Sequence, residues 1–394
     1  MTPLPPLVTP GPQLTGEELE RYARHLSLPQ IGLLGQQRIK NARVLVIGAG
    51  GLGTPALQYL AAAGVGTLGI VDDDVVALSN LQRQVIHTVA DVGRLKTDSA
   101  ADAVARLNPQ VQVQVHPVRL TADNAVDLVG QYDLVLDGAD NFATRYLVSD
   151  ATTLTGRPCV WGSILRFQGQ VSVFWAGHGP TYRDLYPEAP PPGEVPSCAE
   201  GGVMGVLPAV IGSVMTAEAI KLITGTGQPL IGRILMHDAL MMTWRELQLT
   251  PDPDAAPVTA VHEPNLTCTV SGDTEVAPHE TLTALELANL LARRERGEVS
   301  FTLVDVREEW ERELVSIPGA LPASLQQLIA DGEAALPRWA RGTDLVLHCK
   351  TGARSATALT KLRDYFAHRE ESLRHLDGGV LAWVNQVEPG KPTY

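Results

Sequence analysis

The chain has 394 residues and a formal net charge of −13, with hydrophobic residues at 44% and charged residues at 19%. This composition can fill the cores of two or three domains, and it excludes a chain that is disordered throughout. The acidic balance argues against a non-specific nucleic-acid binder.

The N-terminal region lacks the basic segment and apolar run of a signal peptide. Residues 1–14 are rich in proline, and we expect a disordered leader there. Apolar runs such as Gly202–Val214 are too short to span a membrane. The four cysteines include no CxxC pair and make no disulfide framework. We therefore expect a cytoplasmic protein in a reducing compartment, with no membrane partner.

Residues 15–250 predict alternating strands and helices, beginning with a helix that Thr15 and Glu18 open as a capping box. Such alternation is typical of an α/β fold with a mainly parallel, Rossmann-like sheet. The pair Cys159–Gly162 and Gln170–Phe174 indicates antiparallel strands, and Ile211–Thr224 a helix. The earlier expected strands are Arg43–Ile47, Thr67–Val71, Val111–Val115 and Leu134–Leu136, and the helices are Ala56–Ala63, Lys96–Leu107 and Asn124–Gly130.

A stretch dense in proline and turn residues, 251–279, predicts a linker between two domains. Beyond it, residues 280–394 have a common single-domain size. The expected elements there are helix Leu282–Arg296, strands Phe301–Val306 and Leu345–His348, helix Ser355–Tyr365 and a last helix after Gly379.

A glycine-rich loop from Gly48 to Gly53 (GAGGLG) lies between a predicted strand and helix and fits GxGxxG. Backbone N–H groups in such a loop can approach a phosphate, helped by the partial positive charge of the helix N-terminus. Asp72 ends the next strand, where it can hold ribose hydroxyls. By itself this motif favours a dinucleotide-dependent dehydrogenase.

Charged residues beyond Asp72 favour ATP chemistry instead. Arg83 and Lys96, with Asn80, suit the phosphates of ATP, and Asp140 suits Mg²⁺. A dehydrogenase needs an apolar nicotinamide pocket rather than this many charges, whereas adenylation needs cations to stabilise charge as pyrophosphate leaves. Taken one at a time, these residues are more typical of solvated helices and turns than of an ATP site.

The joint order of these motifs resembles bacterial ubiquitin-activating-enzyme-like proteins, above all the molybdopterin-synthase adenylyltransferase family and its thiamine-pathway relatives. The motifs are RYAR from Arg21, GAGGLG, DDD from Asp72, SNLQRQ from Ser79, the Lys96 helix, Asp140-Asn141 and QGQ from Gln168.

The resemblance implies ATP- and Mg²⁺-dependent adenylation of the Gly-Gly C-terminus of a ubiquitin-like sulfur-carrier protein. It further implies a homodimer in which Arg24 reaches the ATP of the neighbouring subunit. Arg83, Lys96 and Asp140 are the catalytic candidates of this domain, with Asp140 as the metal ligand. The implied ATP site comprises Gly48, Gly50, Gly51, Gly53, Asp72, Asp74, Ser79, Asn80, Leu81, Gln82, Arg83, Lys96, Asp140 and Asn141.

The sequence departs from the family at its zinc site, which many members build from two CxxC pairs. Thr181 and Asp184 stand where the first pair is expected, and no second pair occurs near Leu249–Ala260. We therefore expect no zinc.

Cys198 follows a proline-rich loop and has small neighbours that leave room for a substrate tail. It resembles the family's mobile-loop cysteine, which implies a covalent link with the activated tail. A small loop residue without a chemical role is the competing interpretation.

Cys349 ends an apolar strand and begins the loop Lys350, Thr351, Gly352, Ala353, Arg354, Ser355. Loop N–H groups, a helix N-terminus and the two cations favour an anionic sulfur such as a persulfide. A Cys-x5-Arg loop also occurs in phosphatases, where the cysteine attacks phosphate.

Residues 280–394 resemble a single rhodanese domain, through LVDVRE from Leu303, LDGG from Leu376, and Trp383. This resemblance favours sulfur transfer over phosphatase chemistry and implies a cysteine desulfurase or another sulfur donor. Asp305 and Arg307 are expected to brace the loop. Cys159 and Cys268 are expected to have no chemical role.

Together the two domains predict an enzyme that adenylates a sulfur-carrier protein and converts its C-terminus to a thiocarboxylate. The molybdopterin, thiamine, cysteine and tRNA thiolation routes all fit. The alternative is an adenylyltransferase whose rhodanese domain serves a separate sulfurtransferase or regulatory role.

Overall fold

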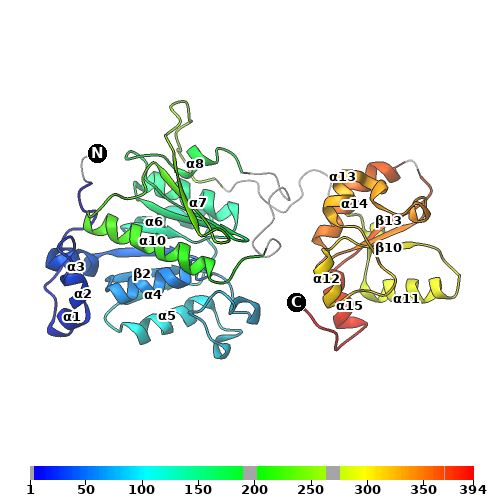
Figure 1. Ribbon diagram of the computed structural model, residues 1–394, viewed down its shortest axis with the longest axis horizontal. Coiled ribbons are helices and arrows are strands. Elements are labelled where there is room, and N and C mark those ends of the chain that lie inside the picture. The colour runs from blue at the N-terminus through cyan, green and yellow to red at the C-terminus, as the bar shows by residue number, and fades with distance from the viewer. Residues whose placement is uncertain (1–3, 190–201, 263–275, 368) are drawn as a thin grey trace. The chain divides into compact units, whose positions relative to one another are not determined.

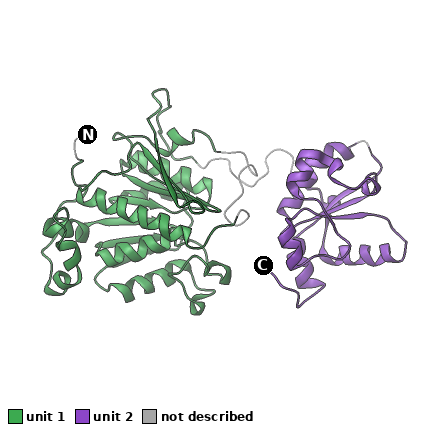
Figure 2. Ribbon diagram, viewed as in Figure 1, with its two compact units in different colours: residues 1–266 green, residues 267–394 purple. Residues whose placement is uncertain are grey.

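The computed structural model describes residues 4–189, 202–262, 276–367 and 369–394. The chain divides into two compact units, Met1–Leu266 and Thr267–Tyr394 (Figures 1 and 2). The predicted linker, 251–279, spans the point of division. Each unit is described by itself.

The first unit is built on an eight-stranded sheet with the order β3-β2-β1-β4-β5-β6-β7-β8. The first five strands run parallel, and β6, β7 and β8 continue the sheet antiparallel. The mainly parallel, Rossmann-like sheet predicted from the sequence is thus confirmed. The strands are β1 (Arg43–Ile47), β2 (Thr67–Val71), β3 (Gln112–His116), β4 (Leu134–Asp137), β5 (Cys159–Leu165), β6 (Gln168–Phe174), β7 (Arg233–Asp238) and β8 (Thr243–Gln248).

The side chains of alternate residues in the central strands are buried in two separate cores, one on each face of this sheet. Val44 and Val46 of β1 belong to one core, and Leu45 and Ile47 to the other. This division follows from the two-residue period of a strand. The first core includes residues of α3 (Gly32–Asn41), α4 (Gly53–Ala63), α5 (Lys96–Leu107) and α10 (Leu207–Thr224), and the second of α6 (Ala122–Gly130) and α7 (Phe142–Thr155). The described part of the unit also has three shorter helices: α1 (Gly16–Arg21), α2 (Ala23–Leu26) and α8 (Tyr182–Leu185).

Helix α10 is the one described helix that is long and apolar enough to cross a membrane by length and composition alone. Most of it is buried inside the first unit, as expected for a core helix, and this weakens any membrane interpretation.

The expectation of a disordered leader is wrong for residues 4–14. The Leu7 N–H donates to the Leu222 carbonyl at 3.0 Å, and the side chain of Val8 is buried in the first core. Prolines make this segment stiff before it folds, so ordering it costs little entropy, while its apolar side chains gain burial.

The second unit has a five-stranded parallel sheet with the order β11-β10-β12-β13-β9. Helices α13 and α14 pack on one face, and α11 and α15 on the other. The strands are β9 (Thr281–Leu282), β10 (Thr302–Asp305), β11 (Leu321–Pro322), β12 (Leu345–His348) and β13 (Leu373–Leu376). The helices are α11 (Ala284–Glu295), α12 (Glu309–Leu314), α13 (Leu325–Asp331), α14 (Ala353–Phe366) and α15 (Gly379–Gln386).

Candidate active sites

A cavity of about 340 Å³ lies at the carboxyl ends of β1, β2 and β4. This is the edge at which open parallel sheets bind ligands. Most of its lining is polar, and the sequence-predicted residues that it brings together are Gly48, Gly50, Gly51, Asp72, Asp74, Arg83, Lys96, Asp140 and Asn141.

Asp72 fixes the glycine loop through a hydrogen bond to Ala49. Its carboxylate accepts from Ala49 N–H at 2.8 Å and from Asp74 N–H at 2.9 Å. Gly53 does not line the cavity, but a side chain there would clash with the Gly48 carbonyl oxygen. Gly53 is therefore needed for the turn itself, whereas Gly48, Gly50 and Gly51 leave the cavity wall open to a phosphate.

Lys96 is a buried cation of the cavity lining, and it is held between two carboxylates. Its Nζ lies 2.7 Å from Asp74 Oδ2 and 4.0 Å from Asp72 Oδ1. Burial raises the pKa of Asp72, and the charge of Lys96 opposes this shift. A triphosphate in the cavity would compete with these carboxylates for the ammonium group.

Asp140 lies at the start of α7, where its exposed carboxylate faces the cavity. Among the described residues, the Asn141 amide donates to it in a long hydrogen bond of 3.5 Å. Asn141 instead caps α7, accepting from Thr144 N–H at 2.9 Å. A carboxylate with so few contacts, beside the glycine loop and Lys96, has the chemistry of a Mg²⁺ ligand.

Six predicted residues lie outside the cavity lining: Gly53, Arg24, Ser79, Asn80, Leu81 and Gln82. The segment from Ser79 to Gln82 leads into Arg83, whose Nη1 donates to the Ser79 carbonyl at 3.1 Å. Arg24 is exposed on α2.

Three residues of this region escaped the sequence analysis. Arg119 lines the cavity from the loop after β3. Arg145 also lines it, and its guanidinium donates twice to the Ala139 carbonyl, at 3.2 and 3.1 Å. Asp137 ends β4 and is buried, which raises its pKa to about 6. Asp137 could have been predicted from the sequence, because it ends a strand of a parallel sheet, where ligands bind.

The segment that departs from the zinc-binding pattern is joined to residue 252 by hydrogen bonds. Asp184 accepts from Thr181 N–H at 2.6 Å and from Thr181 Oγ1 at 2.9 Å. Its other oxygen accepts from Asp252 N–H at 2.7 Å. One carboxylate therefore connects the two stretches in which the family resemblance implies CxxC pairs.

The second candidate site is the loop after β12, where Cys349 lies buried. Its Sγ accepts from Gly352 N–H at 3.1 Å, and the Ser355 hydroxyl lies 3.7 Å from it. Helix α14 begins at Ala353, so its N-terminus adjoins the sulfur. Thr351 and Ala353 are exposed. An N–H group, a hydroxyl and a helix end therefore lie next to the sulfur, and these are groups that suit an anion.

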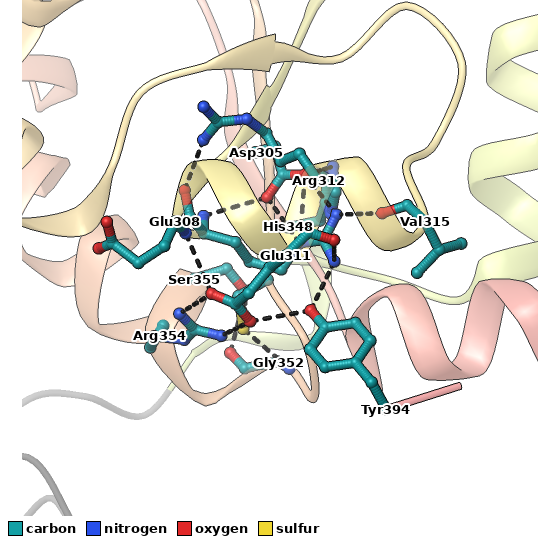
Figure 3. A network of polar contacts seen from close by, with 12 residues as sticks. Asp305, Glu308, Glu311, Arg312, Val315, His348, Gly352, Arg354, Ser355 and Tyr394 are labelled. Carbon is teal, nitrogen blue, oxygen red and sulfur yellow. Dashed lines mark hydrogen bonds and ion pairs between the residues drawn. The ribbon is translucent and has the colours of Figure 1, made fainter. Parts of the chain in front are cut away.

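The two loop cations contact other groups than the sulfur. Arg354 donates twice to the Glu311 carboxylate, at 2.7 and 2.6 Å (Figure 3). Lys350 Nζ lies 4.5 Å from the centre of the Tyr394 ring. Burial would raise the pKa of Glu311, but hydrogen bonds from Arg354, Glu308 N–H and Tyr394 outweigh it and hold the pKa at about 2.

Asp305 and Arg307 form a fully buried ion pair behind this loop, at 2.6 Å. His348 lies beside the pair, with its Nε2 3.6 Å from Asp305 Oδ2. Burial lowers the pKa of His348 to about 4, so the ring is neutral at pH 7.

Of the other three cysteines, the structure describes Cys159. Cys198 and Cys268 lie outside the described residues. Cys159 is buried in β5, and burial raises its thiol pKa well above the ordinary value. It is accordingly an inert thiol of the core.

Comparison with known proteins gives the same two parts. The ThiF family model matches residues 22–258, and the rhodanese-like domain model matches residues 286–386. A probable adenylyltransferase/sulfurtransferase MoeZ of Mycobacterium tuberculosis is 52% identical, with all of both chains covered. The adenylyltransferase and sulfurtransferase MOCS3 of Aedes aegypti is 36% identical over 97% of this chain and 90% of its own.

Other similarities cover about three fifths of the chain. A sulfur carrier protein adenylyltransferase of Thermus thermophilus is 54% identical over 61% of this chain and 90% of its own. The crystal structure of E. coli MccB covers 60% of this chain and 72% of that chain, with a TM-score of 0.55 and 19% identity. At this identity the structural likeness shows the fold alone.

The fold and the two sites define an enzyme that combines adenylyl transfer with sulfur transfer. More particularly, the chain belongs to the ThiF family and carries a rhodanese-like domain after its ThiF region.

Proposed function

We propose that this enzyme adenylates the C-terminal glycine of a ubiquitin-like sulfur-carrier protein and then converts that carboxylate to a thiocarboxylate. The observation that carries the proposal is that one chain holds both parts of the chemistry. A cavity with a glycine loop and buried Lys96 suits ATP. The sulfur of Cys349 accepts a hydrogen bond from a backbone N–H group, which suits a persulfide.

In the first reaction, a carboxylate oxygen of the carrier attacks the α-phosphorus of ATP, and pyrophosphate leaves. Gly48, Gly50 and Gly51 offer open backbone to the phosphates. Lys96 and Arg83 offset the charge that develops on the leaving group. Asp140 would hold Mg²⁺, which would supply further charge stabilisation.

In the second reaction, the Cys349 persulfide attacks the acyl carbon, and AMP leaves with its electron pair. The product is an acyl disulfide between the carrier and Cys349. A second thiolate, for which we propose Cys198, attacks the Cys349 sulfur and releases the carrier thiocarboxylate. The resulting disulfide between the two cysteines is then reopened by a thiol reductant.

We further propose a homodimer, Cys349 persulfide formation by a cysteine desulfurase or another sulfur donor, and a first unit without zinc. The exposed Arg24 outside the cavity suits a cation that serves a second subunit's ATP. The Asp184 hydrogen bonds suit a connection that needs no metal.

The test is the intact mass of a Gly-Gly carrier protein after incubation with the full chain, ATP, Mg²⁺ and thiosulfate. Replacement of one oxygen by sulfur supports the proposal. Carrier-dependent exchange of labelled pyrophosphate into ATP without any gain of sulfur would favour the alternative, an adenylyltransferase with a separate rhodanese role. No exchange with any of the candidate carriers would refute both.

A further inference from the structure

The phenol of Tyr394 lies between two charged groups beside the Cys349 loop (Figure 3). Its oxygen accepts from Arg307 Nη1 at 2.6 Å and donates to Glu311 Oε1 at 2.8 Å. Burial raises the pKa of Tyr394, so the phenol keeps the proton that it donates to Glu311.

This phenol connects the two ion pairs that support the loop. Arg307 is paired with Asp305 at the end of β10, and Glu311 of α12 is paired with Arg354, which follows the Cys349 loop. Arg307, Asp305 and Glu311 are all buried. Removing the hydroxyl would leave buried charged groups with one partner fewer, and such groups depend strongly on complete hydrogen bonding.

The ring of Tyr394 has contacts of its own. It carries Lys350 Nζ at 4.5 Å on its face and packs against Trp310 at 5.7 Å between ring centres. Lys350 is the residue directly after Cys349. A cation over an aromatic face is attracted to it, so the ring restrains the first side chain of the loop.

The backbone of the same loop is held from α15. Val380 N–H donates to the Cys349 carbonyl at 2.8 Å, and Leu381 N–H to the Lys350 carbonyl at 3.2 Å. A side chain at Gly379 would lie 2.5 Å from the Cys349 carbonyl oxygen, so the approach requires glycine. With the backbone fixed by α15, the side chains Lys350 and Arg354 are the parts that Tyr394 controls, one directly and one through Glu311.

We propose that Tyr394 is a positioning residue for sulfur transfer at Cys349, joining the Arg307 and Glu311 ion pairs through its hydroxyl and restraining Lys350 through its ring. This inference rests on the proposed sulfur transfer. Tyr394 acts on the sulfur through the loop and does not touch it. Its loss should therefore change the reactivity of Cys349 while the second unit stays folded.

Thiosulfate and cyanide provide an assay of the full chain that needs neither ATP nor a carrier. The Cys349 thiolate attacks the outer sulfur of thiosulfate, a new S–S bond forms, and sulfite leaves with the electron pair. Cyanide then attacks the outer sulfur of the persulfide, giving thiocyanate and restoring the thiolate.

Tyr394→Phe removes the hydroxyl and keeps the ring. We expect about tenfold slower thiocyanate formation at saturating thiosulfate, from a lost hydrogen bond between charged groups, with the KM for thiosulfate changed less than twofold. The pH profile of Cys349 alkylation by iodoacetamide should move to higher pH. Tyr394→Leu should lower the rate further, because Lys350 then loses the ring as well.

Tyr365→Phe is the matched control, since Tyr365 is an exposed tyrosine of the same unit outside this network. It should leave the rate and the alkylation profile unchanged. A Tyr394→Phe protein with an unchanged rate and alkylation profile overturns the inference, even if its melting temperature falls. Wild-type protein that forms no thiocyanate counts against the proposed sulfur transfer, whereas the alkylation profile still tests the role of Tyr394.

Discussion

Acidification should destabilise the second unit through His348. Both ring nitrogens of this residue are buried and lack a hydrogen-bond partner among the residues that the structure describes. Burial lowers its pKa from 6.5 to about 4. In the unfolded chain His348 therefore takes up a proton below pH 6.5, whereas in the folded unit it stays neutral down to about pH 4.

The difference between the two pKa values of His348 gives both the direction and the size of the change in unfolding free energy. Stability from neutral His348 is fully present above the unfolded pKa of 6.5 and is lost as the pH falls towards 4. At 1.36 kcal/mol per pKa unit, the step from pH 7 to pH 5 should remove about 2 kcal/mol of unfolding free energy. The buried His375, whose pKa burial also lowers, acts in the same direction.

Urea unfolding of the full chain, followed by hydrogen exchange of the β12 amides, measures this change at each pH. His348→Gln should flatten most of the dependence, and His279→Gln, which alters an exposed histidine of the same unit, should not. Equal unfolding free energies at pH 7 and pH 5, or an undiminished slope in His348→Gln, would refute the reasoning.

Further predictions concern single side chains. Cys349→Ala should keep carrier-dependent pyrophosphate exchange and abolish thiolation, and thiocarboxylate on the carrier would contradict its role. Asp140→Ala should lose both activities by at least about a hundredfold, whereas Asp254→Ala, far along the chain in an exposed stretch, should lose neither. Asp137→Asn should stabilise the first unit above pH 6, where the buried carboxylate otherwise ionises, by about 1–3 kcal/mol in urea unfolding; no gain would contradict this. Asp184→Ala should lower the unfolding free energy of that unit by about 1–3 kcal/mol, and Asp184→Asn by less.

Local sequence patterns predicted the central elements well. The bounds of β1, β2, α5 and β12 agree with those expected, because apolar runs and glycine turns mark parallel strands clearly. Helix α7 was missed. Its residues from Phe142 to Thr155 include several threonines, which have a low helix propensity, so the helix depends on burial against the sheet.

In the candidate sites, too, the residues of local motifs could be predicted and the contacts between distant residues could not. The glycine loop, Lys96 and Cys349 were recognisable because each belongs to a compact motif. The pairing of Arg354 with Glu311 joins positions 43 residues apart, and that of Tyr394 with Glu311 joins positions 83 residues apart. Such contacts depend on how helices and strands pack, and residue spacing alone does not specify them.

The Asp184 connection has a consequence for how the first unit matures. A zinc site made of cysteines forms only when the metal is bound. Oxidants and chelators can destroy it. Here one carboxylate holds Thr181 and Asp252, so the connection closes as the chain folds. In the proposed first unit without zinc, this connection is therefore independent of metal supply, and it contains no thiolate that an oxidant could attack.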